Sequence, residues 1–412
     1  MLTPKPKPTL KRSENPFRIH GTVRGAFFTD RDAEVAKFIK VLREPAAKLL
    51  VYGHRRMGKS STLERAVEQV NAKGGHAFLA DLSTATTVVD MSNRILAGAA
   101  RAIGTRWTTL ASDLVSRIQA GIKITPDPLT GAVVPSFEVG IRHESTERQQ
   151  ASLANVLDTM NALAEKRGKV LGVVLDEFQE ITRWGGEQAE WHLRGVMQRH
   201  QHLSYIVAGS KPAMITSMVE QGRAFYELFD VFPFGAINAA HLAQWIDDRL
   251  RGVGLQPQAA GALCVQLAGA RTRDVVRLAR KCVDRANGAG SIDAAAAAAA
   301  FQEVIDEIDE STHSWWDGLT SSQQNVLRAV SVTEQGLTTK AVRQRFSLDG
   351  SGSVTNTLKA LVGDGRLMKT SNGSGYAFDN PFVRGWVIAN AVPDLGLQLP
   401  ITHIASPTSE YH

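Results

Sequence analysis

The most constraining feature of the sequence is a phosphate-binding loop pattern. Residues 53–60 read GHRRMGKS and match G-x-x-x-x-G-K-[ST] at every fixed position. An apolar run at 49–52 precedes the loop as a buried strand would, and helix-compatible sequence follows at 60–70. A strand, a glycine loop and a helix start together direct backbone N–H groups and the positive end of a helix dipole at phosphate groups. The pattern therefore predicts a strand–loop–helix unit that binds a nucleotide.

The loop residues have separate expected tasks. Lys59 would reach the β- and γ-phosphates of ATP, and the Ser60 hydroxyl would bind Mg²⁺. The alternative interpretation is a glycine turn with an exposed lysine. The predicted nucleotide-binding residues of the loop are Gly53, Arg55, Arg56, Met57, Gly58, Lys59 and Ser60.

A second apolar run supplies acidic residues of the kind such a site needs. Residues 169–175 read KVLGVVL and are followed by Asp176 and Glu177. Near-continuous hydrophobicity is typical of a parallel strand buried on both faces, and open α/β sheets bind ligands beyond the carboxyl ends of their strands. Asp176 would hold Mg²⁺ through water, and Glu177 would polarise the water that attacks the γ-phosphate. The alternative is a strand followed by a solvated acidic turn.

Length and composition exclude several classes of protein. A chain of 412 residues is long enough for two or three domains, and 43% hydrophobic with 21% charged residues is ordinary for a globular protein. No apolar stretch has the length of a membrane span, and the basic N-terminus lacks the apolar region of a signal peptide, so we expect a cytoplasmic protein without a membrane partner. The net charge of +6 permits a polyanionic partner without establishing one. Cys264 and Cys282 lack metal-ligand spacing and are expected to be buried free thiols.

Strands alternate with helices up to about residue 237, which predicts a three-layer α/β domain with a mostly parallel sheet. Within it, the helix after the acidic residues is predicted at 191–202 and the next strand at 203–208. Beyond it, helical patterns dominate until three short helices and a glycine-tipped hairpin, the order of a winged helix-turn-helix. The predicted parts are a disordered basic tail (1–14), the α/β core (15–238) with an inserted hairpin (about 122–141), an α-helical subdomain (239–310), the winged unit (314–391) and a flexible tail (393–412).

Together these motifs resemble a known group of proteins. The loop GHRRMGKSS, the strands VVLDEFQE and IVAGS, and the closing DNPFVRGW are similar to those of archaeal-type P-loop ATPases. That group belongs to the STAND class of AAA+ proteins and is similar to origin-recognition initiators. The likeness covers about residues 15 to 390. It implies an AAA+ core, a helical lid, a C-terminal winged helix, and ATP with Mg²⁺ as ligands.

The resemblance also implies further site residues. Ser61 would join the residues that bind phosphate and metal, and Ser210, which ends IVAGS, would occupy a sensor position near the γ-phosphate. A strand-end cap is the alternative role for that serine. The segment GARTRD looks like the lid motif that places an arginine over the phosphates, with Arg273 the expected residue and Arg271 the alternative. Many relatives carry proline where this chain has Thr272. The implied catalytic residues are Glu177, Lys59, Ser210 and Arg273.

A finger arginine, donated across a subunit interface, stabilises charge on the transferring phosphoryl group. Such an interface implies a homo-oligomer as one expected assembly. The sequence leaves three candidates open: Arg223, Arg194 and Arg199.

The predicted recognition helix at 353–363 carries Ser, Thr, Asn and Lys side chains that can contact DNA bases or phosphates. Asp349 and Asp364 flank it, so its face is only mildly basic.

The leading hypothesis is an ATP-binding switch with slow or partner-stimulated hydrolysis, coupled to double-stranded DNA through the winged unit. The alternatives are a signalling or defence regulator whose winged unit docks protein, and a nucleotide sensor in which Glu177 is only a capping group. A metabolic kinase is disfavoured because no acceptor-substrate pocket is legible.

Overall fold

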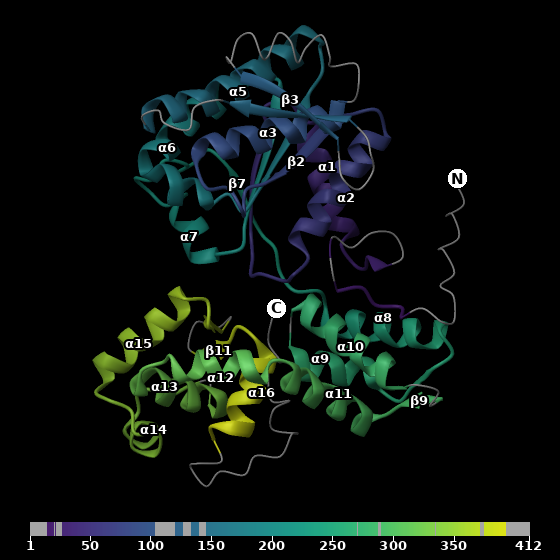
Figure 1. The fold of residues 1–412 in the computed structure, drawn as a ribbon, viewed down its shortest axis with the longest axis vertical. Helices are drawn as coiled ribbons and strands as arrows, with labels where there is room; N and C mark the ends of the chain where they lie inside the picture. The colour runs from purple at the N-terminus through teal and green to yellow at the C-terminus, as the bar shows by residue number, and fades with distance from the viewer. Residues whose placement is uncertain are drawn as a thin grey trace. The chain divides into compact units, whose positions relative to one another are not determined.

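The computed structural model describes two compact units. The described residues are 15–19, 21, 27–103, 120–126, 133–139, 146–269, 271–286, 290–333, 335–370 and 375–392. One unit is Arg31–Gly235, and the other combines Met1–Asp30 with Ala236–His412 (Figure 1). The tails predicted at 1–14 and 393–412 lie outside the described residues. None of the helices in the described ranges combines the length and apolar character that a membrane crossing demands.

A five-stranded parallel sheet forms the centre of the unit Arg31–Gly235. Every residue of its strands β5 and β6 is buried, as expected for central strands covered on both faces. The parallel sheet confirms the predicted α/β class. Strand β6 lies between β1 and β5, so the carboxyl ends of all three meet at one edge. The order across the sheet is β2 (His76–Asp81), β5 (Leu171–Asp176), β6 (Leu203–Gly209), β1 (Lys48–Tyr52) and β7 (Asp230–Pro233).

Helices cover both faces of this sheet (Figure 1). On one face α1 packs against α2, and Leu42 of α1 lies against Gly172 of β5. On the other, α3, α5 and α6 pack with one another and share a core with Val173 and Leu175 of β5. Because successive side chains of a strand point to opposite faces, these residues separate the two helix groups into outer layers. The helices are α1 (Asp32–Arg43), α2 (Lys59–Ala72), α3 (Val88–Ile103), α5 (Thr146–Lys166), α6 (Glu180–Arg199) and the short α7 (Pro212–Ser217).

Helix α6 begins earlier than the sequence pattern predicted. We expected a helix at 191–202, but α6 already starts at Glu180 and ends at Arg199. Gly186 has φ 62° and ψ −168° within it, which marks a kink between two helical stretches. Glycine weakens a helix, so the pair at 185–186 reads as a loop in sequence. Burial of Ile181 and Ala189, on either side of the kink, holds both stretches in the core.

The stretch expected to carry the inserted hairpin holds two antiparallel strands. These are β3 (Ala120–Pro126) and β4 (Val133–Val139), with Ile124 opposite Pro135. The connecting residues 127–132, and residues 140–141 of the expected stretch, lie outside the described residues.

The second unit begins with a helical segment. It consists of α8 (Ala239–Gly252), α9 (Ala260–Ala268), α10 (Thr272–Ala286) and α11 (Ala294–Glu307). Two short strands, β8 (Gln256–Pro257) and β9 (Ser291–Ile292), pair in parallel between these helices. The sequence pattern did not predict this pair because two residues are too few to show a period.

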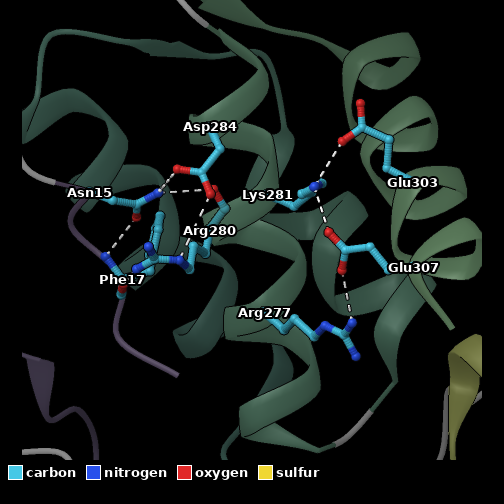
Figure 2. Close-up of polar contacts among 8 residues, drawn as sticks. All are labelled: Asn15, Phe17, Arg277, Arg280, Lys281, Asp284, Glu303 and Glu307. Carbon is cyan, nitrogen blue, oxygen red and sulfur yellow. Dashed lines mark hydrogen bonds and ion pairs between the residues drawn. The ribbon is translucent and has the colours of Figure 1, made fainter. Parts of the chain in front are cut away.

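Figure 2 shows that α10 is held along both of its sides. Towards α11, the Lys281 ammonium pairs with Glu307 at 2.7 Å and Glu303 at 3.1 Å, and Arg277 pairs with Glu307 at 3.0 Å. These ion pairs are partly exposed, so each contributes only about 0–1 kcal/mol. The α10–α11 packing therefore depends mainly on the buried apolar residues beneath them.

On the other side of α10 lies an N-terminal strap, residues 15–17 (Figure 2). The Asn15 amide donates to the Arg280 carbonyl oxygen at 3.0 Å and to the Asp284 carboxylate at 2.7 Å. The Arg280 guanidinium donates back to the carbonyl oxygen of Phe17 at 2.9 Å. The Phe17 ring is fully buried, with its centroid 5.7 Å from that of Trp245. The strap is thus part of the second unit's core.

The last part of the second unit, residues 309–390, is called the C-terminal unit below. Its helices and hairpin follow one another in the predicted order. Helix α12 (Asp309–Asp317) leads into α13 (Ser321–Val332), α14 (Lys340–Arg345) and α15 (Ser351–Gly363). The strands β10 (Leu367–Lys369) and β11 (Tyr376–Phe378) then pair antiparallel, and α16 (Pro381–Asn390) follows. Most of the hairpin tip, 371–374, lies outside the described residues. Helix α16 packs against α11 and α13, so the helical segment and the C-terminal unit share one hydrophobic core.

Candidate nucleotide site

The backbone of the loop 53–60 depends on two glycines. A Cβ atom at Gly53 would lie 2.3 Å from the Phe234 carbonyl oxygen, a distance that no side chain tolerates. Gly58 has φ +96°, in the left-handed region that favours glycine, and caps the start of α2. The first glycine therefore permits close approach of Phe234, the residue that follows β7, and the second permits the turn into the helix.

The Arg31 side chain stabilises the backbone of this loop through hydrogen bonds. The side chain is 5% exposed and donates to the carbonyl oxygens of Met57 at 3.2 Å and Gly235 at 2.8 Å. The guanidinium carbon also lies 4.2 Å from the centre of the Phe234 ring. No sequence motif predicts a role for Arg31, because its acceptors are backbone oxygens that no residue pattern reveals.

Lys59 is buried beneath the loop. Its ammonium group donates to the carbonyl oxygens of Gly53 at 2.9 Å and His54 at 3.4 Å. Burial lowers the pKa of Lys59, and the nearby carboxylates of Asp176 and Glu177 partly offset this effect. The lysine thus lies among the loop carbonyls, with both acidic residues close enough to influence its charge.

The structure brings Ser60 and Asp176 into direct contact. The Ser60 hydroxyl donates to the Asp176 carboxylate at 2.5 Å, across the space between the start of α2 and the end of β5. Asp176 is only 3% exposed, and desolvation raises its pKa, although the bond from Ser60 acts in the opposite direction. A hydroxyl and a carboxylate are oxygen donors that suit Mg²⁺, which completes its coordination with phosphate oxygens and water. The described residues contain no cluster of three His, Cys, Asp or Glu side chains able to hold a metal.

Glu177 lies at the same edge of the sheet and is tied to Ser210. The Ser210 hydroxyl donates to the Glu177 carboxylate oxygen Oε2 at 2.6 Å, and it accepts from Arg55 Nε at 3.2 Å. Glu177 has φ 55°, an uncommon value for a residue with a side chain. Arg55 of the loop, Ser210 at the end of β6 and Glu177 are thus linked in one chain of hydrogen bonds.

The other loop residues differ in exposure. Met57 is buried, Arg56 is exposed in a left-handed conformation (φ 67°), and Ser61 is half-buried. Of the two arginines in GARTRD, Arg273 is exposed, whereas Arg271 is buried and forms ion pairs with Asp274 at 3.7 Å and with Asp379. Arg271 therefore joins α10 to the end of the C-terminal hairpin.

Each candidate finger arginine has partners within its own unit. Arg223 pairs with Glu187 and with the fully buried Glu190. Arg194 donates to the carbonyl oxygens of Ala224 and Tyr226 at 2.6 and 2.7 Å. Arg199 pairs with Asp158 at 3.4 Å, and its side chain is 63% exposed, compared with 29% for Arg223.

The start of α15 presents a mixed polar surface. Ser353, Asn356 and Lys359 are exposed. The Asp349 carboxylate accepts from Ser353 at 3.2 Å and from Ser322 at 3.1 Å, which places a negative charge beside the first turn. Asp349, which the sequence places beside this helix, is therefore hydrogen-bonded to residues of the same surface.

Neither a family model nor a curated protein matches the chain. Among solved structures, a Walker-type ATPase of Pyrococcus abyssi superposes with a TM-score of 0.61 at 16% identity, covering 90% of this chain and 99% of that one. The ORC2 protein of Aeropyrum pernix in its ADP form gives a TM-score of 0.49 at 14% identity, covering 96% and 98%. The ORC1 protein of Aeropyrum pernix in complex with DNA gives 0.46 at 16% identity, covering 90% and 95%.

The chain has the fold of a Walker-type P-loop ATPase. The resemblance inferred from the motifs is thereby confirmed at the level of fold, over nearly the whole chain. Open α/β sheets bind their ligands beyond the carboxyl ends of the strands, and Ser60 contacts Asp176 at this edge of the sheet. At this level of identity the likeness concerns the fold alone, and activity is argued from the site.

Proposed function

We propose that the protein binds ATP with Mg²⁺ at the loop 53–60 and hydrolyses it slowly, as a nucleotide-dependent switch. The observation that carries the proposal is the Ser60–Asp176 hydrogen bond beside buried Lys59, at the carboxyl edge of a parallel sheet. Bound Mg²⁺ would neutralise charge on the β- and γ-phosphate oxygens. The Walker-type fold supports a nucleotide as the ligand.

The residues of the site fit a hydrolytic reaction. Lys59 would exchange its two carbonyl acceptors for phosphate oxygens, which gives its buried charge a stronger partner. Glu177 would accept a proton from the attacking water, and the Ser210 hydroxyl, whose one hydrogen is donated to Glu177, would accept a hydrogen bond from that water. The roles of Ser61, Arg273 and a finger arginine stay predictions from the resemblance.

Nucleotide binding is tested with Lys59→Ala. Loss of a buried charge-assisted hydrogen bond costs about 1.5–3 kcal/mol, so we expect ATP affinity to fall about 10- to 100-fold with little change in melting temperature. Fluorescent ATP titrations with and without Mg²⁺ measure the affinity, and Lys40→Ala, an exposed lysine on α1, is the matched control. Equal affinity in wild type and Lys59→Ala would remove the lysine from the site.

Hydrolysis is tested with Glu177→Gln. General base catalysis contributes about 10²- to 10⁴-fold, so phosphate release should fall by at least about 10²-fold while ATP still binds. The exposed Glu165→Gln on α5 serves as the control. Turnover that is equal in all three proteins would instead favour a nucleotide sensor in which Glu177 has a structural role.

We further propose that nucleotide state is coupled to double-stranded DNA through a winged-helix unit at residues 314–391. The order of three helices and an antiparallel hairpin supports this, with Asn356 and Lys359 exposed on α15. Binding of random duplex DNA should weaken linearly as the logarithm of salt concentration rises. Lys359→Ala should reduce the magnitude of that slope by about one, while Lys40→Ala should leave it unchanged.

Protein docking by the same unit is the second candidate, and the Asp349 carboxylate beside α15 favours it. A slope near zero of the logarithm of DNA affinity against the logarithm of salt concentration would exclude DNA and select this alternative.

We also propose that the protein forms a homo-oligomer. Measuring the mass of the assembly with ADP and with a non-hydrolysable ATP analogue, each with and without duplex DNA, tests it.

A further inference from the structure

We propose that Gln179 is the positioning residue for Glu177 in the hydrolytic reaction, an inference that rests on the proposed function. The Gln179 side-chain amide donates to Glu177 Oε2, the same carboxylate oxygen that accepts from Ser210 at 2.6 Å. The carboxylate is therefore held from two sides, by the start of α6 and by the end of β6.

The burial of Gln179 makes this contact hard to replace. The side chain is 1% exposed, so bulk water does not compete for its amide hydrogens. Within the described residues its own carbonyl oxygen Oε1 is buried without a hydrogen-bond partner. A buried polar atom without a partner costs about 1–3 kcal/mol. The chain therefore keeps an amide here although its oxygen is unpaired, which points to a role for its N–H group at Glu177.

The surrounding backbone is shaped to admit this amide. A Cβ atom at Gly209 would lie 2.2 Å from Ile215 Cγ1 and 2.6 Å from Gln179 Oε1, so the glycine that ends β6 leaves room for both side chains. The Phe178 N–H donates to the Ala208 carbonyl oxygen at 2.8 Å and fixes the turn to β6. Glu177 is held in the left-handed conformation directly before this turn. Backbone and side chain together set the direction of the Glu177 carboxylate.

The consequence for the chemistry concerns the two carboxylate oxygens. Both side-chain donors use Oε2, and in the described residues no side chain donates to Oε1. Oε1 is therefore the oxygen that can accept a proton from water. Holding a general base in one orientation saves the entropy of ordering it at each turnover. Gln179 does not touch the nucleotide in this scheme, because it acts through Glu177.

The experiment compares Gln179→Met, which keeps the side-chain length and removes the donor, with wild type. A lost hydrogen bond to a charged group corresponds to about a 10- to 100-fold effect, so kcat for ATP should fall by that factor. KM and ATP affinity should stay within about twofold of wild type, because Lys59 and Ser60 are untouched. The exposed Gln198→Met on α6 is the matched control and should leave kcat unchanged.

A second measurement does not depend on turnover. The side-chain amide resonance of Gln179, identified by its loss in Gln179→Met, should shift in Glu177→Ala and stay in place in Glu165→Ala. An unchanged or raised kcat in Gln179→Met, or an amide resonance indifferent to Glu177, overturns the inference. A parallel fall in kcat, ATP affinity and melting temperature also overturns it, since that pattern reflects structure. Absence of turnover in wild type contradicts the proposed function instead, and the two failures are thereby distinguished.

Discussion

At the scale of single residues, two opposing effects act on the charged side chains of the candidate site. Burial disfavours their charged forms, and pairing with opposite charges favours them. Burial raises the pKa of Asp176 and lowers that of Lys59, so each charged form is disfavoured by desolvation. The pair partly compensates, because each charge stabilises the other. A site of this kind is less stable when empty than an apolar core of the same size would be.

These opposing effects predict that Asp176→Asn stabilises the nucleotide-free protein at neutral pH. A carboxyl group whose pKa is raised by folding contributes stability below its unfolded value, 3.8, and loses it as pH rises through the folded value. Replacement by the neutral amide removes that loss. We expect a higher melting temperature near pH 7, a gain that shrinks as pH falls toward about 4, and weaker Mg²⁺-dependent ATP binding.

Thermal melting across this pH range, with and without MgATP, measures both effects. Asp81→Asn, at the exposed end of β2, is the control and should leave melting unchanged. A melting temperature that falls in Asp176→Asn at neutral pH would show that pairing with Lys59 outweighs desolvation.

The residues found from sequence alone share one property: their roles follow from spacing along the chain. Lys59 and Ser60 follow from the loop pattern, and Asp176 and Glu177 from the end of an apolar run. Arg31 was missed because its partners are backbone oxygens far away in the sequence. Gln179 was missed although it lies two residues from Glu177, because its role depends on the turn geometry and on the space left by Gly209.

At the scale of elements, His200 connects three parts of the α/β unit. It caps the C-terminal end of α6, and its ring nitrogens contact the Tyr205 hydroxyl of β6 at 2.6 Å and the Asp158 carboxylate of α5 at 2.8 Å. Burial lowers the pKa of His200, while Asp158 raises it and Arg199 and Lys48 act with burial. The neutral ring is thus the form that the fold prefers.

The unit should therefore lose stability in mild acid. A histidine whose pKa is lowered by folding contributes stability above its unfolded value, 6.5, and loses it as pH falls through the folded value. The slope of the unfolding free energy against pH then approaches the value for one bound proton, about 1.4 kcal/mol per pH unit. Urea unfolding between pH 7.5 and 5 measures it. His200→Gln should show a smaller slope, and an identical slope in both proteins would assign the acid sensitivity to another group.

Element boundaries were predictable where periodicity was long and unbroken. Strands β5 and β6 lie close to their predicted positions because continuous apolar runs define them. The first half of α6 was not predicted because Gly185 and Gly186 interrupt the helical pattern, and only packing in the core restores it. Tertiary contacts thus decided the cases in which local preference pointed to a loop.

At the scale of the whole molecule, the second unit has one core where the sequence indicated two domains. Phe382 of α16 is fully buried with its ring centroid 5.3 Å from that of Phe301 on α11. The Trp386 indole N–H donates to Asp309 at 2.7 Å. The DNPFVRGW motif therefore joins the helical segment to the C-terminal unit.

Phe382→Ala should destabilise both parts together. Removing a buried phenylalanine costs about 3–5 kcal/mol, and we expect faster hydrogen exchange in α11 and in α16 alike. ATP affinity at the loop 53–60 should be unchanged. Phe78→Ala, in the core of the α/β unit, is the reciprocal control and should raise exchange there. Faster exchange confined to α16 would mean that the two parts unfold independently.

The N-terminal strap has a consequence for the order in which the protein acquires structure during synthesis. Asn15 bonds to a carbonyl group 265 positions later, and the complete α/β unit is encoded between these two partners. A ribosome therefore finishes the sheet and its phosphate loop while the strap still lacks the helix it packs on. The α/β unit can fold on the nascent chain, whereas the second unit assembles only after α10 has emerged, from segments on either side of a finished insert.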